Sequence, residues 1–282
     1  MINSFIQALH NPGASKNLEQ EKRLATTTEK TKKDKKKTEK PRETFSESLA
    51  GIAAVLVSGL FIITFVVQAF EIPSRSMVNT LLVGDHVFVD RLTPVTSSRI
   101  LGPLMPYREV HRGDIIVFIS PVQAGLHVVK RVIGIPGDKI HLRDGVVYRN
   151  GVALNEPYVI HSGNSNRYAD NFPSVSSEFA RDVSAEWPAV VSAHRQGEDL
   201  VIPPESYFGM GDNRDDSLDS RYWGFIPREN IIGRPLFVYW SFETPEDQYQ
   251  RTSMSERAGF VFHVVIHFFD KTQWRRMFHM VR

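Results

Sequence analysis

Ser76 is the side chain in this sequence with the clearest setting for chemistry. It lies in the turn Ile72-Pro73-Ser74-Arg75-Ser76-Met77, directly after a long apolar run that ends at Phe70. A serine hydroxyl is a weak nucleophile until a neighbouring base takes its proton. None of the ten histidines lies in a recognisable catalytic pattern, so a lysine is the next candidate for that base.

Lys130 has the surroundings that such a base needs. It lies inside Val128–Gly134, a nearly continuous apolar stretch. Burial there would lower the pKa of the amine from about 10.4 toward neutrality. Serine–lysine pairs are a known variant of serine hydrolase chemistry. The alternative interpretation is an ordinary strand lysine whose amine faces solvent.

A third segment, Gly211–Gly224, combines acids, arginines and hydroxyls. A calcium loop of alternating oxygen ligands is one interpretation. Arg214 and Arg221 argue against it, because they would compete with a cation for the same carboxylates. Salt bridges and hydrogen bonds that fix the geometry of a site are the better interpretation.

The apolar run Leu49–Phe70 holds 22 residues and no charge. As a helix it would be about 33 Å long, enough to cross a hydrocarbon core of about 30 Å. A buried core helix and a cleaved signal peptide are the alternatives, but the run is long for either and nearly fifty residues precede it. We therefore expect a membrane anchor over residues 46–70.

The tail before this run is basic, since residues 16–43 contain eleven Lys or Arg and six Asp or Glu. Basic flanks stay in the cytoplasm, so this charge predicts a cytoplasmic, disordered tail over 1–45 and an extracytoplasmic chain from residue 71. Nucleic-acid binding is the alternative for the basic run, and attraction to anionic lipid fits better.

Short β-branched segments separated by Gly, Asp, Asn and Pro follow the run and predict antiparallel strands. No cysteine is present, so disulfides and a cysteine nucleophile are excluded. The polar stretch 160–200 differs and is expected to be an inserted subdomain or an elaborated loop. The strands are expected near these residues: 86–90, 114–119, 127–135, 139–142, 146–149, 199–202 and 235–240.

Taken in order, these motifs closely resemble those of bacterial type I signal peptidases over roughly residues 49–240. The motifs are Ile72–Met77 with Thr80-Leu81 and Gly84-Asp85, Arg112-Gly113-Asp114, Lys130–Asp138 and Gly211–Gly224. The resemblance implies a mainly β fold, in which one transmembrane helix precedes an antiparallel β peptidase domain over 71–245. A second β subdomain is expected as an insert at about 140–203.

The resemblance also implies a role for individual residues. Ser76 matches the nucleophile and Lys130 the general base, while Ser74 matches an oxyanion-hole hydroxyl and Ser217 the residue that orients the lysine amine. No metal and no organic cofactor are implied. The supporting ion pairs match Arg131, Asp212, Asp219 and Arg221, and the pockets for small side chains match Phe70, Ile72, Met77, Leu81 and Val129.

Two positions depart from the family pattern. Asn79 stands where proline is usual, and a proline there would be tolerated if the turn already has φ near that of proline. Asp216 stands where asparagine is usual. Its charge would raise the pKa of Lys130 if it approached the amine, so we expect it to face solvent or an arginine. The second anchor helix of some enterobacterial members is not found.

The C-terminal segment 246–282 contains an apolar stretch, Ala258–Phe269, that is too short to span a bilayer. The aromatic and basic residues Trp274–Phe278 follow it. This mixture suits a bilayer interface, and packing onto the β domain is an equal alternative.

The sequence therefore predicts a membrane-bound serine endopeptidase at the outer face of the cytoplasmic membrane. It would remove signal peptides from exported preproteins after sites of the Ala-x-Ala type. Its expected partners are signal peptides and the phospholipid bilayer, with no nucleic acid and no metal. The alternative is a catalytically silent, membrane-tethered β scaffold that binds exported chains.

Overall fold

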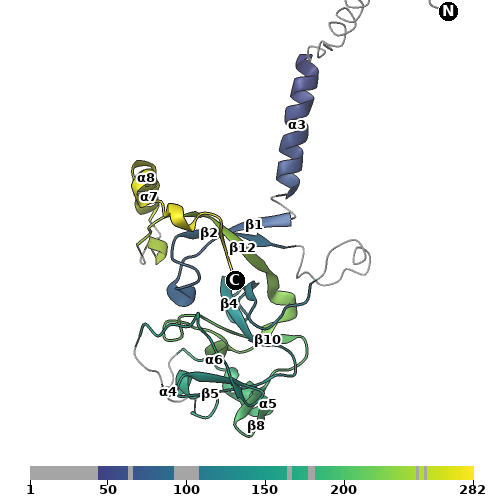
Figure 1. Cartoon of the computed structure of the whole chain (residues 1–282), viewed down its shortest axis with the longest axis vertical. Helices are drawn as coiled ribbons and strands as arrows, with labels where there is room; N and C mark the ends of the chain where they lie inside the picture. Colours follow the sequence, from purple (N-terminus) through teal and green to yellow (C-terminus); the bar gives the residue numbers. More distant parts are fainter. Residues whose placement is uncertain are drawn as a thin grey trace, which may run out of the picture. The chain divides into compact units, whose positions relative to one another are not determined.

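The computed structural model describes residues 44–62, 66–91, 108–163, 167–176, 182–245, 248–250 and 253–282 (Figure 1). The chain divides into two compact units, Met1–Val57 and Ser58–Arg282. The basic tail over 1–43, which was expected to be disordered and cytoplasmic, lies outside the described residues.

The first described helix, α3, runs from Phe45 to Phe61, and none of its residues is buried. A capping box begins it: the backbone N–H of Thr44 donates to the Glu47 carboxylate at 2.8 Å, and the N–H of Glu47 to the Thr44 hydroxyl at 3.4 Å. Apolar residues of good helix propensity then extend the helix.

The prediction of one continuous anchor helix over 46–70 is wrong at its C-terminal end. Residues Val67–Glu71 form strand β1, which pairs with β2. The ladder to β2 supplies the backbone hydrogen bonds of these residues, and valine favours such a strand. In the part of the chain that the structure describes, no helix combines the length and apolar character of a membrane span.

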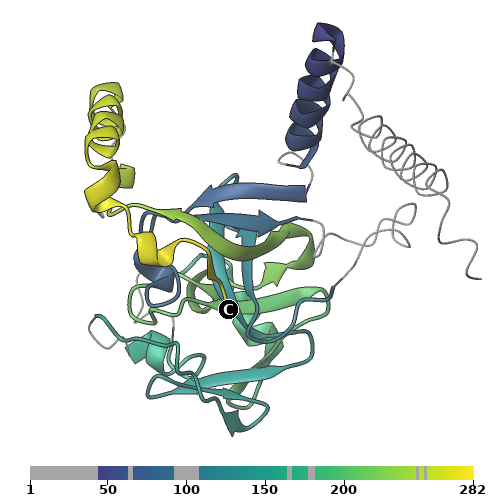
Figure 2. The same ribbon diagram turned by 45° about the horizontal axis from the view of Figure 1, so that its top comes forward.

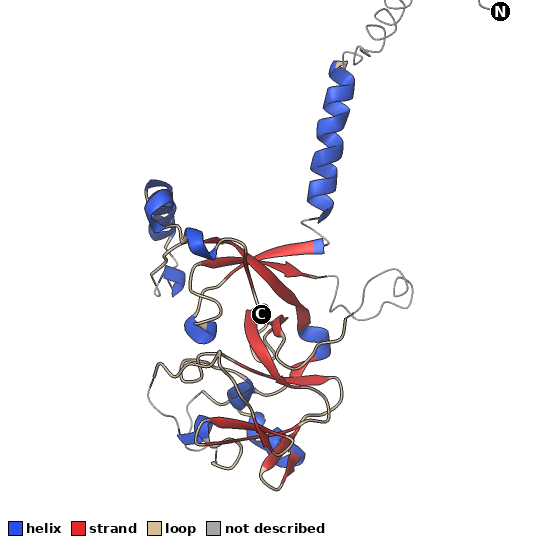
Figure 3. Cartoon of the chain, viewed as in Figure 1, coloured by secondary structure: helices blue, strands red, loops and turns tan. Residues whose placement is uncertain are grey.

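The larger sheet is antiparallel throughout and has the order β1-β2-β12-β3-β4-β10-β11, with β13 paired to β12. The strands of both sheets are drawn in red in Figure 3. The strands of the larger sheet span β1 Val67–Glu71, β2 Asp85–Asp90, β3 Ile115–Ile119, β4 His127–Gly134, β10 Ser206–Met210, β11 Ile226–Pro227, β12 Ile231–Ser241 and β13 His279–Met280.

The smaller sheet is also antiparallel and has the order β7-β6-β5-β9-β8. Asp144 and Gly145, both at positive φ, turn β5 into β6 as the sequence suggests. This sheet lies within the stretch that was expected as an insert, and the mainly antiparallel β fold is confirmed. The strands and helices of this stretch are β5 Lys139–Arg143, β6 Val146–Arg149, β7 Val152–Ala153, α4 Arg167–Asp170, α5 Trp187–His194, β8 Arg195–Gln196 and β9 Asp199–Val201.

Buried apolar side chains join the two sheets. Ile133 and Phe208 of the larger sheet share one cluster with Ile140 and Leu200 of the smaller sheet and with Trp187. A second cluster lies beneath the Ser76 turn and includes residues of that turn, of β2 and of β3. The two clusters hold the β strands that carry the candidate catalytic residues.

Short helical elements lie between and after the strands (Figure 2). The C-terminal helical elements follow β12. The strand after them, β13, returns to pair with β12. The elements are η3 Arg75–Met77, α6 Ser220–Trp223, η5 Arg228–Asn230, η6 Gln248–Gln250, α7 Met254–Ile266, α8 Phe268–Lys271 and η7 Trp274–Arg276.

Candidate functional site

A single turn of 3₁₀ helix, η3, presents Ser76 between β1 and β2. Met77, next in sequence, is 1% exposed in the apolar cluster beneath and anchors the turn. The carbonyl of Ser76 accepts a hydrogen bond from the backbone N–H of Asn213 at 3.1 Å. The turn is therefore held from both sides, by apolar packing and by the chain segment after β10.

Asn79 ends this turn with φ at +90°. Asparagine tolerates the left-handed region, whereas proline is locked at about −65°. The condition under which a proline was expected to be tolerated at this position, a φ near that of proline, is therefore not met in this chain. The Asn79 side chain also donates to the carbonyl of Tyr158 at 3.2 Å.

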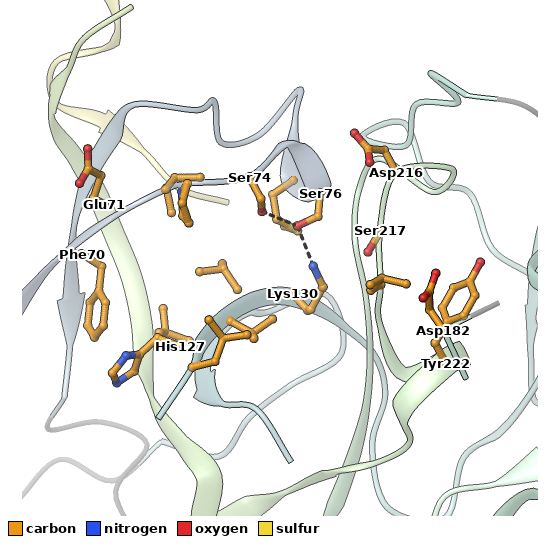
Figure 4. Close-up of a pocket in the computed structure, with 18 of the residues that line it drawn as sticks. Phe70, Glu71, Ser74, Ser76, His127, Lys130, Asp182, Asp216, Ser217 and Tyr222 are labelled. Atoms are coloured by element: carbon orange, nitrogen blue, oxygen red, sulfur yellow. Dashed lines mark hydrogen bonds between the residues drawn. The ribbon is translucent and has the colours of Figure 1, made fainter. Parts of the chain in front are cut away.

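Lys130 lies on β4 directly opposite Ser76, and its Nζ donates to the Ser76 Oγ at 2.6 Å (Figure 4). Both side chains are buried, with exposures of 3% and 8%. The Ser74 hydroxyl lies 3.4 Å from the Ser76 Oγ. Strand β4 is exposed at His127 but buried from Lys130 to Gly134, which places the amine inside the protein.

Burial lowers the pKa of the Lys130 ammonium to about 8. The loss of hydration is the largest cause, the charge of Asp219 opposes it, and the charge of Arg221 adds to it. An amine in this range is partly neutral near neutral pH. It can therefore accept the proton of the Ser76 hydroxyl.

Arg131, the next residue on β4, pairs with Asp212 as expected. Its Nε and Nη2 atoms each donate to the carboxylate at 2.8 Å. The guanidinium also lies 3.9 Å from the ring centroid of Tyr158. Asp212 is therefore paired with Arg131. Among the contacts of the described residues, its carboxylate accepts no hydrogen bond from Lys130.

Asp219 and Arg221 form the second expected ion pair, also bidentate at 2.9 Å. Asp219 additionally accepts from the Ser217 hydroxyl at 2.9 Å. Ser217 was expected to orient the Lys130 amine. In the structure the Ser217 hydroxyl donates to the Asp219 carboxylate, which is a strong acceptor in this buried site, and the orienting role stays a prediction.

Asp216 behaves as its charge suggested. Its carboxylate lies 3.8 Å from Arg75 Nε, and both side chains are substantially exposed. Its charge still reaches Lys130 and raises the pKa of the amine slightly against the effect of burial.

A cleft of about 1330 Å³ runs past Ser76 and Lys130. Four of the five predicted pocket residues line it: Phe70, Ile72, Met77 and Val129. The fifth, Leu81, is fully buried in the cluster below and does not reach the cleft. Phe70 closes one end through an edge contact with His127 at 5.2 Å (Figure 4).

The comparisons with known proteins identify the family of the chain. The family model described as "Signal peptidase, peptidase S26" matches residues 43–240. The chain belongs to this family. Membership in it makes the chain a hydrolase of the serine endopeptidase class.

Individual relatives of the S26 family match much of the chain. A signal peptidase I of Buchnera aphidicola is 30% identical over 275 residues, covering 82% of this chain and 85% of the relative. A signal peptidase I of Pseudomonas aeruginosa is 32% identical and covers 68% of this chain and 71% of the relative. The crystal structure of a signal peptidase I from Enterococcus faecalis has 32% identity and a TM-score of 0.33, covering 45% of this chain and 97% of that one.

The site of this S26 family member also depends on contacts that the sequence interpretation missed. A Cβ at Gly211 would lie 2.4 Å from the Ser76 carbonyl oxygen and 2.3 Å from the Ser217 Oγ, so only glycine fits. Asp85, fully buried, pairs with Arg276 of η7, nearly 200 residues away in sequence. Neither close approach leaves a local signal in one sequence.

Proposed function

We propose that this chain is a membrane-bound signal peptidase I that removes signal peptides from exported preproteins with a serine–lysine pair. The observation that carries the proposal is the hydrogen bond of 2.6 Å between Lys130 Nζ and Ser76 Oγ in a buried setting. A nucleophile and a base with a lowered pKa are then in hydrogen-bonding contact before substrate binds.

The reaction proceeds through an acyl-enzyme. Neutral Lys130 takes the proton of Ser76, and the Oγ forms a bond to the carbonyl carbon of the scissile peptide. Lys130 then gives this proton to the leaving amine as the C–N bond breaks. A water molecule, deprotonated by the same lysine, hydrolyses the ester and restores the hydroxyl.

The oxyanion that forms in each step needs hydrogen-bond donors. The backbone N–H of Ser76 and the hydroxyl of Ser74 are the nearest candidates, since the two serine oxygens are 3.4 Å apart. Fixed donors of this kind stabilise the transition state without reorganisation.

The cleft favours small side chains on the acyl side of the bond. Ile72 and Met77 are almost fully buried, with Phe70 and Val129 beside them, so their space is shallow and apolar. Alanine fits such a surface, and larger side chains are excluded by contact with it. This supports cleavage after Ala-x-Ala type sites.

The membrane location rests on the sequence. The basic flank over residues 16–43 keeps the N-terminus in the cytoplasm, and the peptidase part of the chain then lies outside. Protease added to spheroplasts would digest the β strands and leave a small protected N-terminal fragment. Protection of the β strands would contradict this orientation.

The direct test is cleavage of a preprotein with an Ala-x-Ala site by the purified full chain in detergent. We expect a single new N-terminus directly after the second alanine, and none with the Ser76→Ala variant as the matched control. Binding of the preprotein without cleavage would instead support the silent scaffold. Cleavage that persists in Ser76→Ala would mean that another residue is the nucleophile.

A further inference from the structure

Helix α7 has an unusual distribution of apolar residues around its axis. Its inner face carries Phe260, His263 and Val264, and Phe260 and His263 make ring contacts with Phe242 at 6.2 and 6.0 Å. His267, one turn further along, lies 4.4 Å from His263. The face toward the protein is therefore the one that holds the histidines.

The outer face of α7 is almost purely apolar and exposed. Val261, Phe262, Val265 and Ile266 are between 57% and 69% exposed, and Phe269 just after the helix is 80% exposed. At 100° per residue these positions fall on one side of the helix. We call this set the outer stripe.

The apolar face of a helix in a soluble protein is usually turned toward the protein interior. Burying a large apolar side chain gains about 1.5–3 kcal/mol, and the exposed outer stripe does not make this gain in water. An exposed contiguous apolar stripe marks a surface that another apolar phase covers.

The chain beside α7 continues the same surface. Trp274, Phe278 and Met280 are exposed by 49%, 72% and 53%, and Arg275 lies exposed between the first two. Aromatic rings mixed with arginine are typical of the headgroup level of a bilayer. Helix α7 has 13 residues, about 20 Å, which is too short to cross a hydrocarbon core and long enough to lie along its surface.

Charge is distributed in the same sense. Residues 253–282 contain five Lys or Arg and two Asp or Glu, whereas residues 44–252 contain 18 and 24. A basic segment on an otherwise acidic region is attracted to anionic lipid. A symmetric dimer through this segment is disfavoured, because it would bring two basic surfaces together.

We propose that the outer stripe of α7 lies in the lipid headgroup region as a contact separate from the N-terminal segment. This contact also bears on the site, because Arg276 of η7 donates to Asp85 and to the carbonyl of Thr80 in the chain just after the Ser76 turn. The lipid contact thereby fixes the height of the cleft above the bilayer. The inference rests on the proposed membrane location but not on the peptidase chemistry.

The test uses the absence of cysteine from the chain. A nitroxide label is attached to Phe262→Cys or Val265→Cys in the full chain, reconstituted into vesicles of neutral and anionic phospholipid. Val152→Cys, on β7 of the smaller sheet, is the matched control, since Val152 is 67% exposed like Phe262. The circular dichroism spectrum of each variant, compared with that of the unchanged chain, reports that it is folded.

Oxygen concentrates in lipid, whereas a nickel chelate stays in water. For each label we compare relaxation by oxygen with relaxation by the chelate, and we expect this ratio to be at least about threefold higher at 262 and 265 than at 152. The same result in a Ser76→Ala background would separate this contact from catalysis. Equal chelate access at 262 and 152 would overturn the proposal. So would shielding from both reagents, or spin–spin broadening that grows with protein density, since these indicate a protein partner or a second copy.

Discussion

Lys130 and Arg131 are neighbours on β4 and are equally buried, yet Arg131 is paired with a carboxylate and Lys130 with a hydroxyl. Arg131 donates two hydrogen bonds to the Asp212 carboxylate, and Arg221 donates two to the Asp219 carboxylate. Among the described residues, the hydrogen-bond partner of Lys130 is the Ser76 hydroxyl.

This difference shows how the protein separates structure from reactivity. A buried cation with a bidentate carboxylate keeps its proton and fixes the chain, whereas a buried amine facing a hydroxyl loses its proton readily. The carboxylates of Asp212 and Asp219 act on the charge of Lys130, but their hydrogen bonds from guanidinium groups come from the neighbouring arginines. The ion pairs therefore hold the site rigid without neutralising the proposed base.

The largest expected effect comes from removing either member of the reactive side. Ser76→Ala and Lys130→Ala should each lower kcat/KM by about 10⁴-fold or more, because residues that act as one unit fail together. The double variant should lose little beyond either single one. Steady-state cleavage of a signal-sequence peptide measures all three, and additive losses would contradict a shared role.

Asp219→Ala tests the structural role of the buried ion pairs, because it leaves Arg221 buried without its carboxylate. Loss of one partner of a buried pair costs about 3–5 kcal/mol of stability. The matched control is Glu198→Ala, which removes the partner of Arg143 in a pair more than half exposed and should cost at most about 1 kcal/mol. Urea unfolding of the two variants measures the difference, and equal losses would contradict the structural role of the buried pair.

Ser74→Ala tests the donors on the nucleophile's side of the site. If the hydroxyl is one of several oxyanion donors, kcat should fall by about 10²–10³-fold while the other donors remain. The pKa that governs the rate should not move, because Lys130 and its surroundings are unchanged. A loss as large as that of Ser76→Ala would mean that the nucleophile is wrongly assigned.

The smallest effect is expected from Asp216→Asn, which removes a charge that raises the pKa of Lys130. The pKa of the amine should fall, so the rising limb of activity should move to lower pH by less than about one unit, since exposed charges are screened. The pH dependence of kcat/KM for this variant and the unchanged chain measures it. A shift to higher pH would contradict the sign.

Local pattern was enough to predict much of this molecule. Strands such as β4 and the Asp144-Gly145 hairpin follow from β-branched runs and turn residues, and the Arg131–Asp212 pair was expected from the family resemblance. Strand β1 was assigned to a helix, because an apolar stretch satisfies both patterns until its partner is known.

What sequence could not supply was long-range closeness. The partner of Ser217, the contact of Gly211 with Ser76 and the burial of Leu81 below the cleft depend on how distant segments meet. The positive φ of Asn79 likewise depends on the turn that closes onto β2. These features follow from tertiary packing, which leaves no periodic signal along the chain.

The pH dependence of kcat/KM tests the central claim most directly, namely that Lys130 is the base because its charge is buried and unpaired. With a pKa of about 8, activity should rise about tenfold per pH unit below that value and level off above it. The Lys130→Arg variant should be inactive at every pH, because guanidinium does not lose its proton in this range. A rate that still climbs above pH 10, or an active arginine variant, would contradict the account.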